Sequence, residues 1–228
     1  MTDRPKALVT GASRGVGAAV ARALASTHDV LLGGRDEAAL TALAAELPGS
    51  RPWPVELTRV TAADVEDVER LDVLVHSAGV SVLGRIADQP ADVWRRTMEV
   101  NVVAVAELTR LLLPALRAAG GHVVCVNSGS GQRANPDWAS YAASKFALKA
   151  FADALRLEEP ALRVTTVYPG RTATDMQRGV RAFEGGEFEP EKYLRPESVA
   201  RAVLAAVTAG PDAHLTELTL RPRGGPVN

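Results

Sequence analysis

The chain has 228 residues, 46% of them hydrophobic and 23% charged, a composition typical of one globular domain with a sizeable core. Its 26 basic and 27 acidic residues nearly cancel, which excludes the strongly basic footprint of a nucleic-acid-binding domain. The sequence shows no long apolar run, signal-peptide core or Cys/His metal cluster, and its lone Cys125 cannot form an internal disulfide. We therefore expect residues 1–228 to form one domain of a cytoplasmic protein, with no metal, membrane or nucleic acid as partner.

Apolar, β-branched segments alternate along the chain with segments rich in alanine and leucine, which predict strands and helices respectively. Most of the strand candidates are almost continuously apolar, as parallel strands buried on both faces are. The expected fold class is α/β, with a doubly wound parallel sheet of seven strands and helices on both faces. Strands are expected at residues 6–10, 29–33, 51–57, 72–76, 122–127, 163–168 and 215–220, and helices at 15–26, 37–47, 62–70, 91–118, 141–159 and 196–209.

The first predicted strand runs into a glycine-rich turn at residues 10–17, TGASRGVG, and then into a helix. Glycines at such a turn let the backbone bend tightly and approach a pyrophosphate closely. The N-terminus of the following helix offers free N–H groups and a positive dipole end to the phosphates. The turn therefore predicts a dinucleotide site, although its G-x-x-x-G-x-G spacing differs from the best-known G-x-G-x-x-G pattern.

The end of the second predicted strand indicates which dinucleotide binds. NAD enzymes usually place an acid there for the ribose hydroxyls, whereas here the position is Gly34, followed by Arg35. The planar fork of an arginine suits a 2′-phosphate, and Arg14 in the glycine turn could reach the same group. The two cations and the missing acid favour NADP(H). The alternatives are that both arginines are solvated surface charges, or that Asp36 faces the ribose instead.

Tyr141 and Lys145 lie four residues apart at the start of a predicted helix, so their side chains share one face. A neighbouring ammonium stabilises a phenolate and lowers a tyrosine pKa from its usual value near 10, which suits acid–base catalysis. The alternative is a surface pair, because this spacing is common by chance. Ser128 favours the catalytic interpretation, since it follows a predicted strand at the end where doubly wound sheets bind ligands.

Together these motifs resemble the short-chain dehydrogenase/reductase family over nearly the whole chain. The turn at residues 10–17 is similar to the family's TGxxxGxG pattern, and Tyr141 and Lys145 are similar to its catalytic pair. Ser128 lies 141 − 128 = 13 residues before the tyrosine, as the catalytic serine of the family does. Asn101 resembles the family's asparagine, and residues 169–170 resemble its Pro-Gly turn after the sixth strand.

The resemblance implies a Rossmann fold and an NADP(H)-dependent oxidoreductase that interconverts a small carbonyl compound and a secondary alcohol. Tyr141 would protonate the carbonyl oxygen, Ser128 would orient it, and Lys145 would bind the nicotinamide ribose and lower the tyrosine pKa. Asn101 would hold a water that links Lys145 to solvent. Cofactor contacts are expected from Gly11, Ser13, Arg14, Gly15, Val16, Gly17, Arg35, Glu56, Leu57, Ser77, Ala78, Gly79, Asn101, Tyr141, Lys145, Pro169, Gly170, Thr172 and Thr174.

Two other functions stay open at this point. A catalytically silent NADP-binding regulatory or scaffold protein would keep the fold without turnover, and an epimerase or dehydratase would use the same fold for another reaction. The segment 217–222 resembles the branch that contains NADP-dependent 3-hydroxy acid dehydrogenases, which suggests a substrate class. The resemblance also implies a homodimer or homotetramer, paired through the helices predicted at 91–118 and 141–159.

Several residues depart from the family pattern or lack a clear role. His76 replaces an asparagine and is expected to be structural, and Glu56 has a longer side chain than the acid that usually meets adenine. His28, His122 and His214 are expected at the surface or in turns. Trp138 is either a packing residue or a wall of the substrate pocket. The segment 176–194, which contains Phe183, Phe188 and Tyr193, lacks clear periodicity and predicts a long loop that forms a substrate lid, its aromatics either covering the substrate or anchoring the loop.

Overall fold

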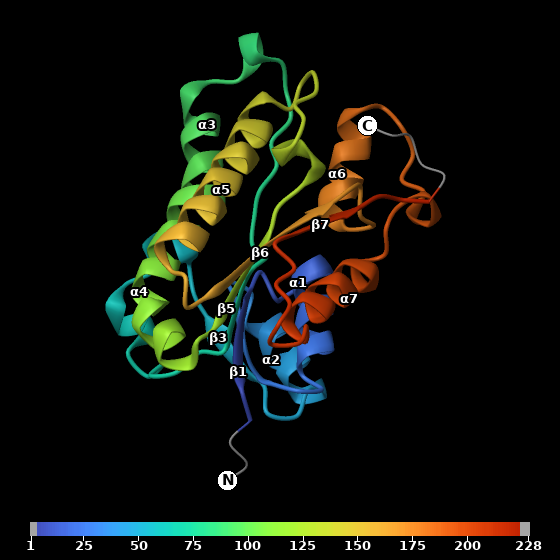
Figure 1. Ribbon diagram of the computed structural model, residues 1–228. Coiled ribbons are helices and arrows are strands. Elements are labelled where there is room, and N and C mark those ends of the chain that lie inside the picture. Colours follow the sequence, from blue (N-terminus) through green and yellow to red (C-terminus); the bar gives the residue numbers. More distant parts are fainter. Residues whose placement is uncertain (1–3, 224–228) are drawn as a thin grey trace.

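The computed structural model describes residues 4–223, which include one seven-stranded sheet (Figure 1). All neighbouring strands are parallel, in the order β3-β2-β1-β4-β5-β6-β7. The strand order reverses between β1 and β4, the kind of switch point at which doubly wound sheets bind ligands. The predicted α/β Rossmann fold is therefore confirmed. The strands are β1 (Lys6–Thr10), β2 (Asp29–Gly34), β3 (Arg51–Pro54), β4 (Val73–His76), β5 (His122–Val126), β6 (Arg163–Pro169) and β7 (Glu217–Leu220).

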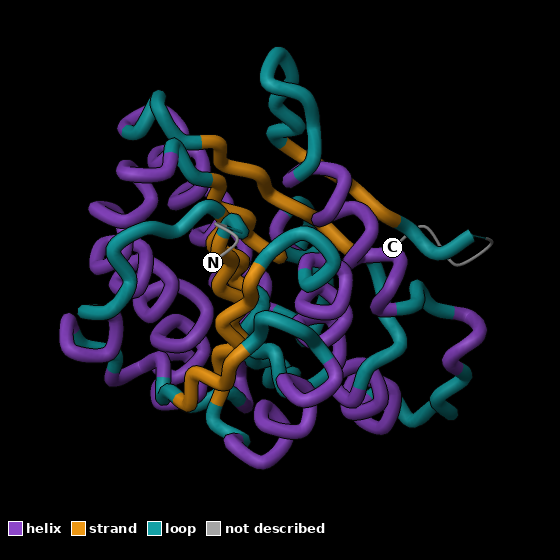
Figure 2. The backbone as a smooth tube through the Cα atoms, turned by 90° about the horizontal axis from the view of Figure 1, so that it is seen from below, coloured by secondary structure: helices purple, strands orange, loops and turns teal. Residues whose placement is uncertain are grey.

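Helices cover both faces of the twisted sheet, as the view from below in Figure 2 shows. Successive strand residues point to opposite faces, so Val9 packs in one core with α1, α2 and α7, while Leu8 packs in the other with α4 and α5. Among residues 4–223, no helix combines the length and apolar character needed to cross a membrane. The helices are α1 (Gly15–Leu24), α2 (Glu37–Glu46), α3 (Ala91–Met98), α4 (Ala104–Ala119), α5 (Ala139–Glu158), α6 (Asp175–Phe183) and α7 (Pro196–Val207).

The long helix expected at residues 91–118 is interrupted. Between α3 and α4 the chain forms a π-helical turn, η4 (Glu99–Val103), which contains the buried Asn101. Such turns insert one residue into the α-helical ladder and are frequent at functional sites. The left-handed Gly120, with φ 57°, then ends α4. A helix-period pattern alone does not reveal the inserted residue, because it changes the direction of the side chains without breaking the helix.

The helix predicted at residues 62–70 is wrong. Only a single turn forms there, η2 (Ala62–Val65), and its Asp64 carboxylate accepts from the N–H of Thr61 at 2.7 Å. The surrounding backbone groups are bound to neighbouring elements instead. The Trp53 indole donates to the carbonyl of Asp64 at 2.9 Å, and the N–H of Leu71 donates to the carbonyl of Ala115 at 3.1 Å. Tertiary hydrogen bonds therefore override the local helical pattern.

The segment 176–194 is not the structureless loop that its sequence predicts. It contains most of α6 and a short turn, η6 (Pro190–Lys192). The hydroxyl of Thr174 caps α6 by accepting from the N–H of Gln177 at 3.3 Å. Only Gln177 and Val180 of this helix are buried, so its apolar face is too narrow to give a clear helical period.

Two of the three histidines expected at the surface or in turns are buried. His28 follows α1, and His122 begins β5 with no exposed surface. The His122 ring bonds the hydroxyl of Thr165 at 2.7 Å, and burial lowers its pKa to about 3. His214 is exposed and packs edge-on against His122, with ring centroids 6.0 Å apart. His28 and His122 flank strands, as expected, but neighbouring elements cover the ends of the sheet there and bury both side chains.

Candidate active site

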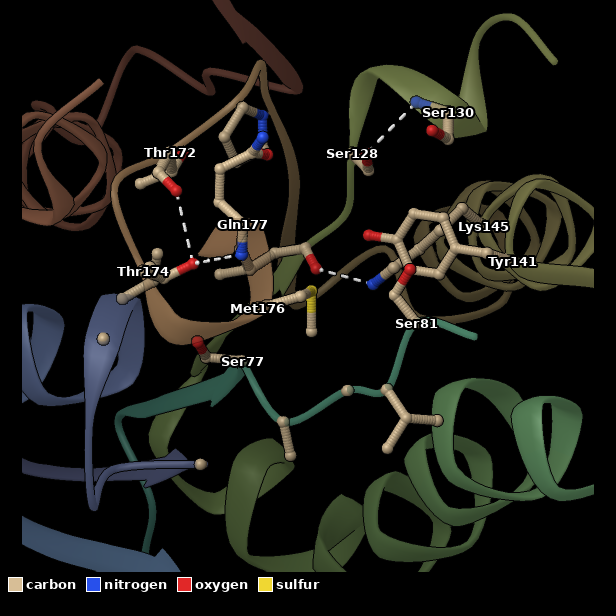
Figure 3. A pocket seen from close by; sticks show the side chains of 18 of the residues that line it. Ser77, Ser81, Ser128, Ser130, Tyr141, Lys145, Thr172, Thr174, Met176 and Gln177 are labelled. Atoms are coloured by element: carbon tan, nitrogen blue, oxygen red, sulfur yellow. Dashed lines mark hydrogen bonds between the residues drawn. The ribbon is translucent and has the colours of Figure 1, made fainter. Parts of the chain in front are cut away.

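A cavity of about 1230 Å³ lies at the carboxyl ends of the parallel strands (Figure 3). Loops that follow β1, β2, β3, β4, β5 and β6 all contribute to its wall. Every site residue predicted from the sequence lines this one cavity, with the exception of Asn101. We call the part around residues 11–17, 34–35 and 55–57 the glycine-loop end, and the part around Ser128, Gln132, Arg133, Trp138 and Tyr141 the tyrosine end.

The glycine turn leaves no room for a side chain at Gly11 or Gly17. Gly11 has φ +68°, and a Cβ there would lie 2.9 Å from the Cα of Ala78. A Cβ on Gly17 would clash with the carbonyl oxygen of Gly11, so α1 packs directly against the turn. No side chain caps the N-terminus of α1, whose first N–H groups are therefore available to an anion. This cradle fits the pyrophosphate of a dinucleotide.

Thr10 ties the glycine turn to the loop after β4. Its hydroxyl accepts from the N–H groups of Ser77 and Ala78 at 3.1 and 3.2 Å, and donates to the carbonyl of Val75 at 3.4 Å. The sequence places Thr10 in the motif without indicating this contact, which joins residues more than 60 positions apart. It holds two walls of the glycine-loop end together.

The two arginines at the glycine-loop end are paired with carboxylates. Arg14 lies 3.6 Å from Asp175, and Arg35 lies 3.5 Å from Glu56. Both guanidinium groups are largely exposed. Burial raises the pKa of Glu56, but hydrogen bonds from Thr58 and the charge of Arg35 outweigh it, so the net pKa is lowered. Glu56 therefore faces Arg35 and Thr58.

Asp36 has a structural use in this region. Its carboxylate accepts from the N–H of Ala39 at 3.0 Å and so caps α2. The side chain that competed with Arg35 for the ribose position in the sequence is thus engaged by the helix that follows β2. Arg35 and its partner Glu56 are therefore the charged side chains at this edge of the cavity.

At the tyrosine end, Tyr141 and Lys145 project from the first turns of α5 and are both buried. The Lys145 ammonium lies 5.8 Å from the centroid of the Tyr141 ring and donates to the carbonyl of Val126 at 3.2 Å. Ser128 lies two residues after β5 and accepts from the N–H of Ser130 at 3.1 Å. Figure 3 shows these three side chains around the same space.

The protonation of these groups is set mainly by burial. Burial raises the pKa of Tyr141, and the neighbouring Ser128 hydroxyl only partly offsets the effect. This differs from the lowered tyrosine pKa expected from a nearby ammonium, because the cost of burying a phenolate is the largest contribution to the shift. Burial lowers the pKa of Lys145 to about 8. The chain alone therefore keeps Tyr141 protonated at neutral pH.

Asn101 lies behind the cavity wall. Its amide oxygen accepts from the N–H of Val80 at 2.9 Å, and its nitrogen donates to the Val80 carbonyl at 2.9 Å and to the Ser144 hydroxyl at 3.0 Å. The side chain thus fastens the loop after β4 to α5. It does not line the cavity, and a direct cofactor contact of Asn101 stays a prediction. A water held between Asn101 and Lys145 stays a prediction.

Asn127 is a site residue that the sequence did not reveal. Its amide oxygen accepts from the N–H of Ser128 at 2.8 Å, and its nitrogen donates to the carbonyl of Lys145 at 3.0 Å. It therefore connects the turn that carries the serine to the helix that carries the lysine. Its position directly before Ser128 is the only signal in the sequence, and there it looks like the end of a strand.

Trp138 and the lid have distinct roles. The Trp138 ring lines the cavity and packs edge-on against Tyr141, with centroids 5.8 Å apart, so it is a wall of the pocket. Phe188 stacks on Tyr193 at 5.6 Å, and neither ring nor Phe183 lines the cavity. Phe188 and Tyr193 therefore pack within the segment, whereas Phe183 is exposed. The residues of the predicted lid that line the cavity are Met176, Gln177, Val180 and Glu184.

His76 is buried between β4 and α4. The buried His76 ring bonds the hydroxyl of Thr109 at 2.9 Å, and burial lowers its pKa to about 3. It braces β4 against α4 and does not line the cavity, in agreement with a structural role.

Within residues 4–223, no group of three His, Cys, Asp or Glu side chains could hold a metal ion.

Comparison with known proteins identifies the family. The family model described as short chain dehydrogenase matches residues 5–185. A glycine betaine reductase of Emericella nidulans is 36% identical over 97% of this chain, which spans only 19% of that protein's length. An alcohol dehydrogenase from the archaeon Thermococcus sibiricus, complexed with 5-hydroxy-NADP, has 26% identity, a TM-score of 0.85 and 96% coverage of both chains. A variant of actinorhodin polyketide ketoreductase, with NADPH, has 26% identity, a TM-score of 0.86 and 97% coverage of both chains. The chain belongs to the short-chain dehydrogenase family of oxidoreductases.

Proposed function

We propose that this protein is an NADP(H)-dependent oxidoreductase that interconverts a carbonyl compound and a secondary alcohol. The observation that carries the proposal is the arrangement of Ser128, Tyr141 and Lys145 around the same cavity that the glycine turn lines. A protein that only bound a nucleotide would need the glycine turn but not this second set of side chains. Two structurally similar proteins in complex with NADP derivatives or NADPH support the choice of cofactor.

The two arginines of the glycine-loop end are suited to hold a 2′-phosphate. Their pairs with Asp175 and Glu56 are exposed, and exposed ion pairs of this kind contribute only about 0–1 kcal/mol. A phosphate with several charges can therefore displace both carboxylates at little cost. The glycine turn and the uncapped α1 would hold the pyrophosphate.

When bound, the reduced nicotinamide supplies a hydride to the carbonyl carbon. Tyr141 is positioned to give its proton to the carbonyl oxygen, and burial keeps it protonated for that purpose. Ser128 orients the oxygen beside Tyr141. In the oxidative direction the positive charge of the oxidised ring would favour the phenolate, a contribution that the buried Lys145 complements. Asn127 and Asn101 fix the turns on which these groups stand.

The test of this function is a reduction assay on the intact protein. Purified protein is mixed with NADPH and a panel of aldehydes, ketones and oxo acids, and cofactor oxidation is followed by absorbance. We expect turnover with at least one carbonyl class and a preference for NADPH over NADH. Tight NADPH binding with no oxidation by any carbonyl would instead favour the regulatory or scaffold function.

We also propose that the protein forms a homo-oligomer through the helices of the α4 and α5 layer. Phe146 and Leu157 are eleven residues apart on α5, so they share one helix face, and both are exposed, as is Val103 directly before α4. A dimer or tetramer would cover these side chains. Sedimentation analysis of the wild type and of a Leu157→Glu variant would test this, with a shift towards monomer expected in the variant. The cytoplasmic location stays a prediction.

A further inference from the structure

Arg221, which directly follows β7, presents a fixed guanidinium group to the tyrosine end of the cavity. It donates to the carbonyls of Tyr168 and Leu220 at 3.2 and 3.0 Å, and to the side-chain oxygen of Gln132 at 3.1 Å. Gln132 is itself held by Thr219, at 3.3 Å. An arginine has five N–H donors, so two of them are unused within residues 4–223. The group is both oriented and able to bind a further acceptor.

This guanidinium lies close to Ser128. A Cβ on Gly129, the residue after Ser128, would be 3.5 Å from one terminal nitrogen of Arg221 and 3.7 Å from the other. Gly170, after β6, leaves space for the stem of the same side chain, since a Cβ there would lie 3.4 Å from its Cδ. Arg221 therefore lies beside the turn that carries Ser128.

The charges around the tyrosine end are not balanced. Arg96 and Arg133 line the cavity together with Arg221, and none of the three makes an ion pair within residues 4–223. The carboxylates that line the cavity are each paired with another arginine. They are Glu56 with Arg35, Asp175 with Arg14, and Glu184 with Arg171 and Arg181. The tyrosine end therefore presents net positive charge to whatever enters it.

We propose that Arg221, oriented by Gln132, is a carboxylate-binding subsite and that the substrate is an oxo acid or the corresponding hydroxy acid. This inference rests on the proposed carbonyl reduction at Ser128 and Tyr141. The planar fork of an arginine matches a carboxylate in geometry as well as in charge. With the carboxylate on Arg221, the carbonyl of a short oxo acid reaches Ser128 and Tyr141, and Arg133 adds to the attraction.

The test compares two nearly isosteric substrates, a short 3-oxo acid and its primary amide, in the wild type and in Arg221→Met. In the wild type we expect a higher kcat/KM for the acid. In the variant, kcat/KM for the acid should fall about 10- to 100-fold, as expected for the loss of a hydrogen-bonded charge, while that for the amide changes within about twofold. The amide reaction shows that the variant is folded. Arg221→Lys, which keeps the charge but loses the fork, should fall between the two.

Arg201→Met is the matched control. Arg201 is exposed on α7, bonds only Ser198 within the described chain, and does not line the cavity, so its loss should leave both reactions unchanged. Equal losses for the acid and the amide in Arg221→Met would show a purely structural arginine and overturn the subsite. A wild type that reduces the amide as well as the acid would overturn it too.

Substrate binding is also measured without turnover, through the fluorescence of NADPH bound to the wild type. The acid, but not the amide, should change this fluorescence, and the change should be lost in Arg221→Met. Acid binding that depends on Arg221 without any cofactor oxidation would support the subsite and disprove the proposed reaction. Turnover of neutral carbonyls with no acid-specific binding would support the reaction and disprove the subsite.

Discussion

The glycine-loop end and the tyrosine end of the cavity are stabilised by different kinds of contact. At the glycine-loop end the backbone itself forms the cradle. The arginines there are exposed, and each is paired with a carboxylate that a phosphate can replace. At the tyrosine end the working groups are held by amides such as Asn127 and Asn101 through bonds between distant segments. The first end is suited to admit and release a charged cofactor, whereas the second keeps a fixed geometry during the reaction.

The largest effect is expected from Tyr141→Phe, which removes the proton donor from the tyrosine end. Turnover should fall by about 10²- to 10⁴-fold, because a positioned acid contributes on that scale. The dissociation constant of NADPH, measured by fluorescence titration, should change little, since the phosphate cradle is built at the other end. An unchanged kcat would remove Tyr141 from the mechanism.

Arg35→Ala addresses the glycine-loop end. The dissociation constant of NADPH should rise about 10- to 100-fold, whereas that of NADH, which lacks the 2′-phosphate, should change within about twofold. Arg110→Ala is the control, because Arg110 is exposed on α4, pairs only with Glu107 within the described residues, and does not line the cavity. Equal weakening of both cofactors would show that Arg35 does not contact the 2′-phosphate.

Gly17→Ala tests whether the cradle depends on backbone contact. Its Cβ would meet the carbonyl of Gly11, so the turn or α1 must shift, and the free energy of unfolding should fall by about 1–3 kcal/mol, with weaker NADPH binding. Gly179→Ala in α6 is the matched control. A Cβ there has no heavy atom within 4 Å, so the same change should stabilise the protein by about 0.5–1 kcal/mol. Thermal and urea unfolding would measure both, and similar effects at the two sites would refute the argument.

The last effect concerns pH and the buried His76. Burial lowers its pKa from 6.5 to about 3, so the unfolded chain binds the extra proton first. Its contribution to stability is complete above pH 6.5 and is lost, at about 1.4 kcal/mol per pH unit, as the pH falls from 6.5 towards 3. In His76→Asn, urea unfolding between about pH 6 and 4 should show a shallower dependence by that amount. Parallel slopes for both proteins would mean that His76 is not buried in the neutral form.

The sequence predicted the sheet and most of the site because both depend on local patterns. The apolar runs gave all seven strands, and the glycine turn, Ser128 and the Tyr141–Lys145 spacing gave residues that line one cavity. What it could not give depends on contacts between distant segments. The turn at η2 reflects bonds from Trp53 and Leu71 to other elements, and the roles of Asn127 and Asn101 appear only when β5, η4 and α5 are brought together.

Because of the π-turn at Asn101, the rotation of α3 relative to α4 depends on the number of residues in η4. Each residue of an α-helix turns the chain by about 100°, so one residue deleted within η4 would rotate α3 relative to α4 by that angle. Asn101 would then point away from Val80 and Ser144. Related chains that share this site should therefore keep Asn101 and the length of η4, even where the other residues of η4 differ. Insertions or deletions in this helix would indicate that the site has been lost.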